Sequence, residues 1–251
     1  MQRIYNKLVH EWIYYLKYLN KHYPYMIALI IRTNPFDETA DAYVKEWKMK
    51  SSIILCGGQS RRMGQDKGSL IIKDKPMIKY ILSTLNNEID EAIIVLNDSK
   101  RIDKYKEFIN PDDYSYNVKF IEDKIKNKGP ISGILTGLEN ISSQYAIVFP
   151  CDSPNVTKNT IQTLFNEITD DCQAIVPYHN VENKLKTSEP LHSIYNKNII
   201  PIINEQILSD SLHIKGIIEK IETRFVLIDN KKILKKEFEN LNRPEDLKIF
   251  D

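Results

Sequence analysis

The sequence has little cysteine, no long apolar run and almost no net charge. Its cysteines are too few and too scattered for a disulfide framework or a zinc site; they are Cys56, Cys151 and Cys172. Isolated cysteines of this kind fit a reducing compartment, so we expect a cytoplasmic protein. No stretch reaches the roughly 18 apolar residues of a membrane-spanning helix. The net charge of +1 creates no overall field for nucleic acid or an anionic membrane, and neither is expected as a partner.

The 251-residue chain is long enough to bury a substantial core, and its composition is typical of a globular protein. Residues 1–50 differ from the rest. Apolar residues recur there at helical spacing over 3–21, which predicts an amphipathic helix with a packing or dimer face. We therefore divide the chain into an N-terminal helical extension, 1–50, and a main domain, 51–251. Met49 stands just before the first core strand, so the alternative is that the native chain starts there.

From residue 51 onward, short apolar runs alternate with segments of helical pattern. The apolar runs predict strands at 53–56, 92–96, 118–121, 145–149 and 174–176. The helical pattern predicts helices at 76–85, at 99–108, in a segment ending near 141, and from 157 onward. Apolar strands separated by helices are typical of an α/β protein, with a mostly parallel sheet and helices on both faces.

Ligands bind to such sheets at the carboxyl ends of the strands. Four loops begin at those ends, at Cys56, Asn97, Asp123 and Pro150. We expect these loops to meet around one cleft.

The segment 51–70, SSIILCGGQSRRMGQDKGSL, predicts an anion site. Gly57 and Gly58 let backbone N–H groups approach a ligand, because no Cβ stands in the way. Arg61, Arg62 and Lys67 add positive charge to the same loop. A buried strand that runs into such a loop indicates a site for a polyphosphate. The alternative, a surface turn with solvated charges, fits this density of glycine and cations less well.

Asp152 follows a predicted buried strand and is flanked by Pro150 and Pro154. Mg²⁺ takes hard oxygen ligands from one or two carboxylates and from substrate phosphates, so a carboxylate at this position could hold it. The alternative is a turn aspartate that hydrogen-bonds its own backbone, and spacing does not separate the two. Asp123 has the same placement at a strand end, where it could bind a sugar hydroxyl.

Cys151 and His192 have weaker contexts. Cys151 adjoins Asp152, but no histidine is locally paired with it, which favours a buried structural thiol over a nucleophile. His192 precedes a strand-like segment, 193–195. An isolated histidine of this kind is usually structural, although it could contact a second substrate.

Residues 55–67, LCGGQSRRMGQDK, resemble the pattern L-A-G-G-x-S-x-R-M-G-x-D-K of the molybdenum cofactor guanylyltransferases, a family of the nucleotidyltransferase superfamily. Later motifs are similar to that family's and stand in the same order: ED and then GPISG within 122–133, PCDSP at 150–154, EPLHSIY at 189–195 and NLNRPEDL at 240–247. The departures are Cys56, where the family usually has alanine, and the long polar segment 178–188.

The resemblance implies a Rossmann-like, doubly wound fold and a specific reaction. GMP is transferred from GTP to the terminal phosphate of molybdopterin or molybdenum-molybdopterin, with Mg²⁺ as cofactor, and pyrophosphate is released. The implied catalytic residues are Arg62, Lys67 and Asp152, with Asp152 as the metal ligand. The implied nucleotide-binding residues are Leu55, Cys56, Gly57, Gly58, Lys67, Asn97, Asp123 and Asp152. The implied second-substrate residues are Glu189, Pro190, Leu191, His192, Asn240 and Asn242. Positioning and charge neutralisation suffice for this chemistry, so no protein nucleophile is needed.

Three alternatives stay open. Cytidylyl relatives use CTP and usually have Ala-Gly where this chain has Gly57-Gly58, and cobinamide-phosphate guanylyltransferases use another acceptor. A third possibility is a non-catalytic nucleotide-binding module whose N-terminal helix docks onto molybdoenzymes or other cofactor-biosynthesis proteins. The presence of Arg62, Lys67 and Asp152 argues against this third alternative.

Overall fold

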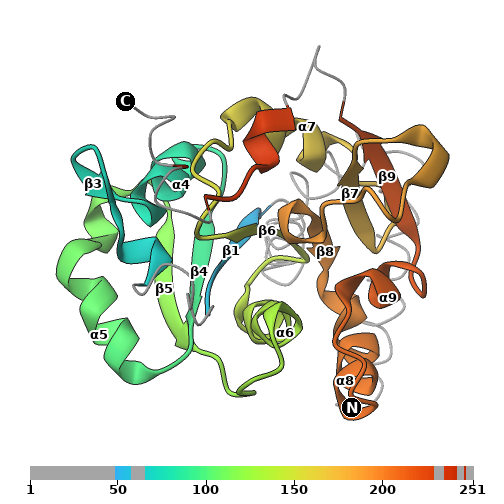
Figure 1. Ribbon diagram of the computed structural model, residues 1–251, viewed down its shortest axis with the longest axis horizontal. Coiled ribbons are helices and arrows are strands. Elements are labelled where there is room, and N and C mark those ends of the chain that lie inside the picture. The colour runs from blue at the N-terminus through green and yellow to red at the C-terminus, as the bar shows by residue number, and fades with distance from the viewer. Residues whose placement is uncertain (1–48, 58–65, 229–234, 242–245, 247–251) are drawn as a thin grey trace, which may run out of the picture. The chain divides into compact units, whose positions relative to one another are not determined.

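The computed structural model describes residues 49–57, 66–228, 235–241 and 246 (Figure 1). By its internal contacts the chain divides into two units, residues 1–48 and 49–251. The first unit, which carries the expected N-terminal helix, lies outside the described residues. The fold below is that of the second unit.

A seven-stranded sheet forms the centre of this unit, in the order β5-β4-β1-β6-β8-β7-β9. Its strands are β1 (Ser51–Cys56), β4 (Glu91–Leu96), β5 (Asn117–Glu122), β6 (Tyr145–Pro150), β7 (Ala174–Tyr178), β8 (Ile194–Asn196) and β9 (Thr223–Leu227). All neighbouring pairs are parallel except those that β8 makes with β6 and β7. A separate antiparallel pair consists of β2 (Ile71–Ile72) and β3 (Lys75–Pro76). The expected mostly parallel sheet is confirmed.

Helices cover both faces of the sheet, as predicted. They are α4 (Ile78–Leu85), α5 (Ser99–Phe108), α6 (Pro130–Asn140), α7 (Lys158–Asn166), α8 (Ile200–Leu208) and α9 (Ile214–Ile218). Alternate residues of each strand point to opposite faces, so Ile54 packs with α4, α5 and α7, while Ile53 packs with α6, α8 and α9. Short 3-10 turns lie between these elements: η1 (Lys67–Ser69), η2 (Pro111–Asp113), η3 (Val181–Asn183), η4 (Pro190–His192), η5 (Lys197–Ile199) and η6 (Lys235–Phe238).

The strand order reverses beside β1. The chain steps outward from β1 to β4 and β5, and then returns through α6 to β6 on the other side of β1. Figure 1 shows β4, β5 and α5 on one side of β1, and β7 and β9 on the other. Such a reversal opens a crevice at the carboxyl ends of the strands, which is where α/β proteins bind ligands.

Small differences from the expected elements have local causes. The helix expected from residue 76 begins at Ile78, because Pro76 belongs to β3. Helix α5 has the expected bounds, and its N-cap is Asp98, whose carboxylate accepts a hydrogen bond from the backbone N–H of Arg101. No helix among the described residues is long and apolar enough to cross a membrane.

Candidate functional site

A cavity of about 1150 Å³ lies at the carboxyl ends of β1, β4, β5 and β6. Residues that begin the four loops predicted to converge there, Cys56, Asn97, Asp123 and Pro150, all line it. The volume exceeds that of a typical small-molecule pocket. One cavity therefore has room for a nucleotide together with a second substrate group.

Lys67 and Asp152 meet in this cavity. The Lys67 Nζ atom lies 2.6 Å from Oδ2 of Asp152, and their side chains are 18% and 12% exposed. Lys67 begins η1, directly after the glycine loop, and Asp152 follows β6. Tertiary contact thus brings the predicted phosphate-binding lysine to the predicted metal ligand.

Helix α5 supports the segment that carries Lys67. Arg101 donates a hydrogen bond to the carbonyl oxygen of Cys56 (3.1 Å), and its guanidinium lies 3.7 Å from the carboxylate of Asp66. One turn further along, Lys104 donates to Oγ of Ser69 (3.0 Å). Helix α5 therefore holds both ends of the glycine loop, the segment 57–66: Cys56 precedes the loop, and Asp66 and Ser69 lie at its far end.

Arg101, Lys104 and Tyr105 were not among the site residues predicted from the sequence. The hydroxyl of Tyr105 lies so close to Gly68 that a Cβ there would be 2.2 Å from the oxygen. The three side chains stand at i, i+3 and i+4 on α5, the spacing of one helix face. The sequence shows that these residues share one face of α5, but it does not show what that face contacts.

Asn97 and Gly57 are tightly fitted to each other. A Cβ at position 57 would lie 2.7 Å from Oδ1 of Asn97, so glycine lets this amide keep its present position. Lys126 donates hydrogen bonds to the carbonyl oxygens of Asn97 and Asp123, and it therefore joins the loops after β4 and β5. These contacts shape the wall of the cavity beside Gly57.

Asp123 is buried and accepts hydrogen bonds from side chains in the first turns of α6. Its Oδ2 accepts from Ser132 Oγ (2.7 Å), and its Oδ1 accepts from Thr136 Oγ1 (3.0 Å) and from the backbone N–H of Ile125 (3.1 Å). Protein donors thus already occupy both carboxylate oxygens. Asp123 lines the cavity, as expected, and it also has a clear structural role there.

The thiol of Cys56 is unsuited to nucleophilic chemistry. Burial, together with a hydrogen bond that the Cys56 thiol donates to Cys151, raises the pKa of Cys56 well above its usual range. Cys56 and Cys151 are both free and buried. Both cysteines therefore act as small wall residues at the ends of β1 and β6.

The second-substrate residues occupy different depths. Leu191 and Asn240 line the cavity, whereas His192 is only 1% exposed and contacts Ser153 instead of the cavity. Glu189 lies away from the cavity lining and pairs with His179 at 2.7 Å. Pro190 begins η4, and its carbonyl oxygen accepts from the Tyr195 hydroxyl (2.8 Å).

Four other residues singled out in the sequence lie outside the described part of the chain; they are Gly58, Arg61, Arg62 and Asn242.

The donor set at Asp152 is compatible with Mg²⁺. Within the described residues, no group of three or more His, Cys, Asp or Glu side chains is arranged to hold a metal. Mg²⁺ usually binds through one or two carboxylates, with substrate phosphates and water completing its shell. Asp152 can supply one such oxygen in a cavity that also holds Lys67. This arrangement fits a metal that arrives with its nucleotide.

Comparison with known proteins places this geometry in a family. Residues 52–223 match the family described as MobA-like NTP transferase domain. The probable molybdenum cofactor guanylyltransferase of Methanothermobacter thermautotrophicus is 32% identical over 205 residues, which cover 80% of this chain and 99% of that protein. The molybdenum cofactor guanylyltransferase of Aliivibrio salmonicida is 32% identical, over 81% of this chain and 96% of that protein.

Solved structures show the same architecture. The molybdopterin-guanine dinucleotide biosynthesis protein A of Archaeoglobus fulgidus superposes with a TM-score of 0.64 at 25% identity, covering 80% of this chain and 96% of that one. The 4-diphosphocytidyl-2C-methyl-D-erythritol synthase of Anaerococcus prevotii has a TM-score of 0.60 at 15% identity, with 81% and 94% covered. The second likeness concerns the fold alone.

Proposed function

The chain belongs to the MobA-like NTP transferase family, and on this premise we propose that it transfers GMP from GTP to the terminal phosphate of molybdopterin or molybdenum-molybdopterin. An oxygen of the acceptor phosphate attacks the α-phosphorus of GTP. The bond between the α-phosphorus and the bridging oxygen breaks, and pyrophosphate leaves. The product is a guanine dinucleotide cofactor. The observation that carries the proposal is the contact between Lys67 and Asp152 inside the cavity at the strand ends.

The residues of the chain position the nucleotide. Lys67 would bind the triphosphate and Asp152 would hold Mg²⁺, which when bound neutralises phosphate charge. Asn97 and Asp123 would lie near the nucleoside. The guanine and ribose would rest on the end of β1, at Leu55, Cys56, Gly57 and Gly58. Arg62, in the same loop as Gly58, would add charge opposite the phosphates.

The acceptor would occupy the part of the cavity lined by Leu191 and Asn240. These two residues belong to the EPLHSIY and NLNRPEDL motifs. Asn242 would extend the same surface, and Glu189 and Pro190, which precede Leu191 in the chain, would support it from outside the cavity lining. The two substrates would then approach from different strand ends, with their phosphates meeting near Asp152.

The N-terminal segment, 1–50, would be an extension to a catalytic domain at 51–251. The family match begins at residue 52, and the relative from Methanothermobacter thermautotrophicus aligns over 99% of its own length with only 80% of this chain. A docking role toward other cofactor-biosynthesis proteins or molybdoenzymes is compatible with this arrangement. The free cysteines are compatible with a cytoplasmic location.

The direct test is mass analysis of the products formed from GTP, Mg²⁺ and molybdopterin by the full chain. The expected products are the molybdopterin guanine dinucleotide and an equal amount of pyrophosphate. Product from CTP, or from GTP and cobinamide phosphate, with none from GTP and molybdopterin, would replace the proposal by one of its relatives. No turnover with any of these pairs, despite nucleotide binding, would favour an accessory module.

A further inference from the structure

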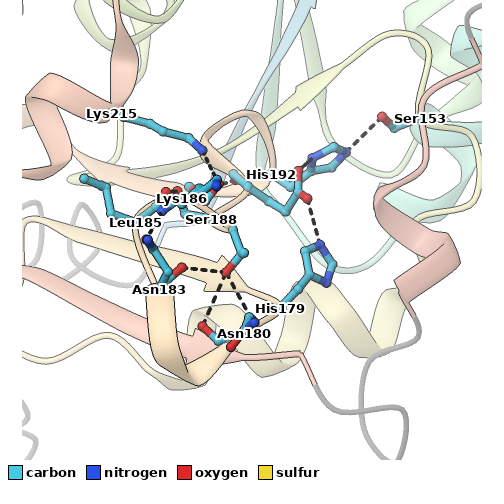
Figure 2. A network of polar contacts seen from close by, with 12 residues as sticks. Ser153, His179, Asn180, Asn183, Leu185, Lys186, Ser188, His192 and Lys215 are labelled. Carbon is cyan, nitrogen blue, oxygen red and sulfur yellow. Dashed lines mark hydrogen bonds and ion pairs between the residues drawn. The ribbon is translucent and has the colours of Figure 1, made fainter.

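A buried hydrogen-bonded chain runs behind the acceptor side of the cavity. Nε2 of His192, on η4, lies 2.9 Å from Oγ of Ser153, the residue after Asp152 (Figure 2). The Ser153 hydroxyl in turn donates to Oδ1 of Asn240 at 2.5 Å. Within the described residues, the hydrogen bonds of the His192 ring reach the cavity wall through Ser153.

Ser153 belongs to a joint between two distant segments. The backbone N–H of Leu241 donates to the carbonyl oxygen of Asp152 (2.9 Å), next to the bond between Ser153 and Asn240. Two consecutive residues after β6 are therefore tied to two consecutive residues after η6. The amide oxygen of Asn240 is one of the groups held by this joint.

Counting protons shows which atoms donate and which accept in the hydrogen bonds that link His192, Ser153 and Asn240. The single hydroxyl proton of Ser153 is donated to Asn240, so Ser153 must accept a hydrogen bond from Nε2–H of His192. Burial lowers the pKa of His192 to about 3, which leaves the ring neutral with one N–H. Nδ1 of His192 then carries the lone pair, and it has no hydrogen-bond partner among the described residues.

The ring of His192 is also held in place by packing. Phe149 and Phe238 meet it edge to face, with ring centroids 6.1 Å and 5.2 Å away. Glu189 comes no closer to Nδ1 of His192 than 3.9 Å, and its other oxygen lies 2.7 Å from Nε2 of His179. The His192 ring therefore has a fixed orientation and a fixed tautomer, and its one hydrogen bond within the described residues is to Ser153.

We propose that His192 is a positioning residue for the acceptor: through Ser153 it turns the oxygen of the Asn240 amide inward and its NH₂ group toward an anionic phosphate in the cavity. An amide NH₂ group is a suitable donor for phosphate oxygen, whereas a flipped amide would present its oxygen and repel it. This inference rests on the proposed function and deepens it. It assigns His192 an indirect role in place of direct contact with the second substrate.

The test compares His192→Leu with His192→Gln in the full chain. Leucine fills the space without a donor, whereas the amide nitrogen of glutamine can still donate to Ser153. We expect His192→Leu to lower kcat/KM for molybdopterin roughly tenfold, the size of one hydrogen bond to a charged group, with KM for GTP unchanged. His192→Gln should recover most of the loss. Equal changes in both KM values, or no recovery in a folded His192→Gln variant, would overturn the proposal.

A double-mutant cycle separates positioning from general packing. In an Asn240→Ala background, His192→Leu should cause no further loss of kcat/KM for molybdopterin, because the path to the acceptor is already cut. Additive losses would contradict the proposed path. If the parent chain uses cobinamide phosphate instead of molybdopterin, the proposed function fails, and the same variants are measured with that phosphate acceptor.

A measurement that needs no turnover completes the test. Nitrogen-15 NMR of the imidazole should show His192 protonated at Nε2 and bare at Nδ1 near pH 7. If the ring is instead protonated at Nδ1, Nε2 accepts the hydrogen bond from Ser153 and the order of donors from His192 to Asn240 is reversed. This result would overturn the proposal, whatever reaction the protein catalyses.

Discussion

The ammonium of Lys67 lies 2.6 Å from the carboxylate of Asp152, although the two residues are 85 positions apart. Each is mostly buried, so each contributes to the charge compensation of the other when no ligand is bound. A metal–triphosphate complex supplies a cation for Asp152 and an anion for Lys67. Binding should therefore separate the pair. Replacing Asp152 should impair metal-dependent turnover, whereas replacing Lys67 should weaken nucleotide binding.

Replacing Asp152 by asparagine should abolish metal-dependent turnover. The amide keeps the shape and one oxygen, but it lacks the charge that holds Mg²⁺. We expect kcat to fall by about 100-fold or more, with the far-ultraviolet circular dichroism spectrum unchanged. Steady-state kinetics across a Mg²⁺ titration measures this loss. Turnover equal to that of the parent would remove the support for Asp152 as metal ligand.

Lys67→Met is the matched control for Asp152→Asn. It removes the other charge of the pair and leaves the metal ligand in place. We expect KM for GTP to rise about tenfold, which corresponds to one lost charge-assisted hydrogen bond, while the remaining activity still depends on Mg²⁺. Loss of metal dependence in this variant would mean that the two roles are not separable.

GTP with Mg²⁺ should raise the melting temperature of the chain, and CTP should not. A ligand at 100 times its Kd stabilises the folded state by about 2.7 kcal/mol. For a domain of this size, that corresponds to a shift of about 5–10 °C. Differential scanning fluorimetry at matched nucleotide concentrations measures the shift. A larger shift with CTP would reassign the nucleotide.

Gly68→Ala should impair both folding and catalysis, because the new Cβ would lie 2.2 Å from the hydroxyl oxygen of the buried Tyr105. We expect a loss of about 1–3 kcal/mol of stability, the usual cost of overpacking. A displaced Lys67, the preceding residue, should lower kcat as well. Urea denaturation and steady-state kinetics measure the two effects.

Adding Tyr105→Phe to Gly68→Ala should restore much of the loss. Without the hydroxyl, the nearest ring atom is Cζ at 3.1 Å, a tight contact that a small shift relieves. If the double variant is as unstable as Gly68→Ala alone, the collision with Tyr105 is not the cause.

His192 should make the protein less stable in mild acid. Burial, and secondarily the charge of His179, lowers the pKa of His192 from 6.5 to about 3. Between these values the unfolded chain binds a proton that the folded chain excludes, so stability is full above pH 6.5 and is lost as the pH falls toward 3. The loss attributable to His192 should reach about 2 kcal/mol at pH 5.

His192→Gln isolates this contribution, because glutamine does not titrate. Urea denaturation at pH 7 and at pH 5 should show the parent losing about 2 kcal/mol more than the variant between the two values. Glu189 and His179, the titratable neighbours of His192, are present in both proteins. Parallel losses in parent and variant would show that His192 does not titrate in this way.

Much of the sheet was predictable from local pattern. The apolar runs of β1, β4 and β6 are buried on both faces, so they show as continuous hydrophobic segments with turn residues at their ends. β8 and β9 escaped full prediction. β8 has three residues and runs antiparallel, and β9 is partly exposed at the edge of the sheet, so neither has the length or apolar continuity that marks a central strand.

The candidate site also contains residues that the sequence predicted and residues that it did not. Lys67, Asn97, Asp123 and Asp152 follow strands, and the parallel order of the sheet brings them to one cavity, as expected. Arg101 was not expected, because its importance lies in the carbonyl oxygen of Cys56, which no sequence pattern marks. The burial of His192 was equally hidden, since the three residues around its ring come from β6, the following loop and η6.

By itself, the sequence determined the alternation of strands and helices and the resemblance to one family, and it predicted an anion site in the loop after β1. These properties follow from spacing and residue type within short segments. Only the tertiary structure decided that Lys67 meets Asp152, that α5 holds both ends of the glycine loop and that His192 acts on Asn240 through Ser153. These contacts join residues between 35 and 87 positions apart, and their geometry is set by how the strands order and how the side chains pack.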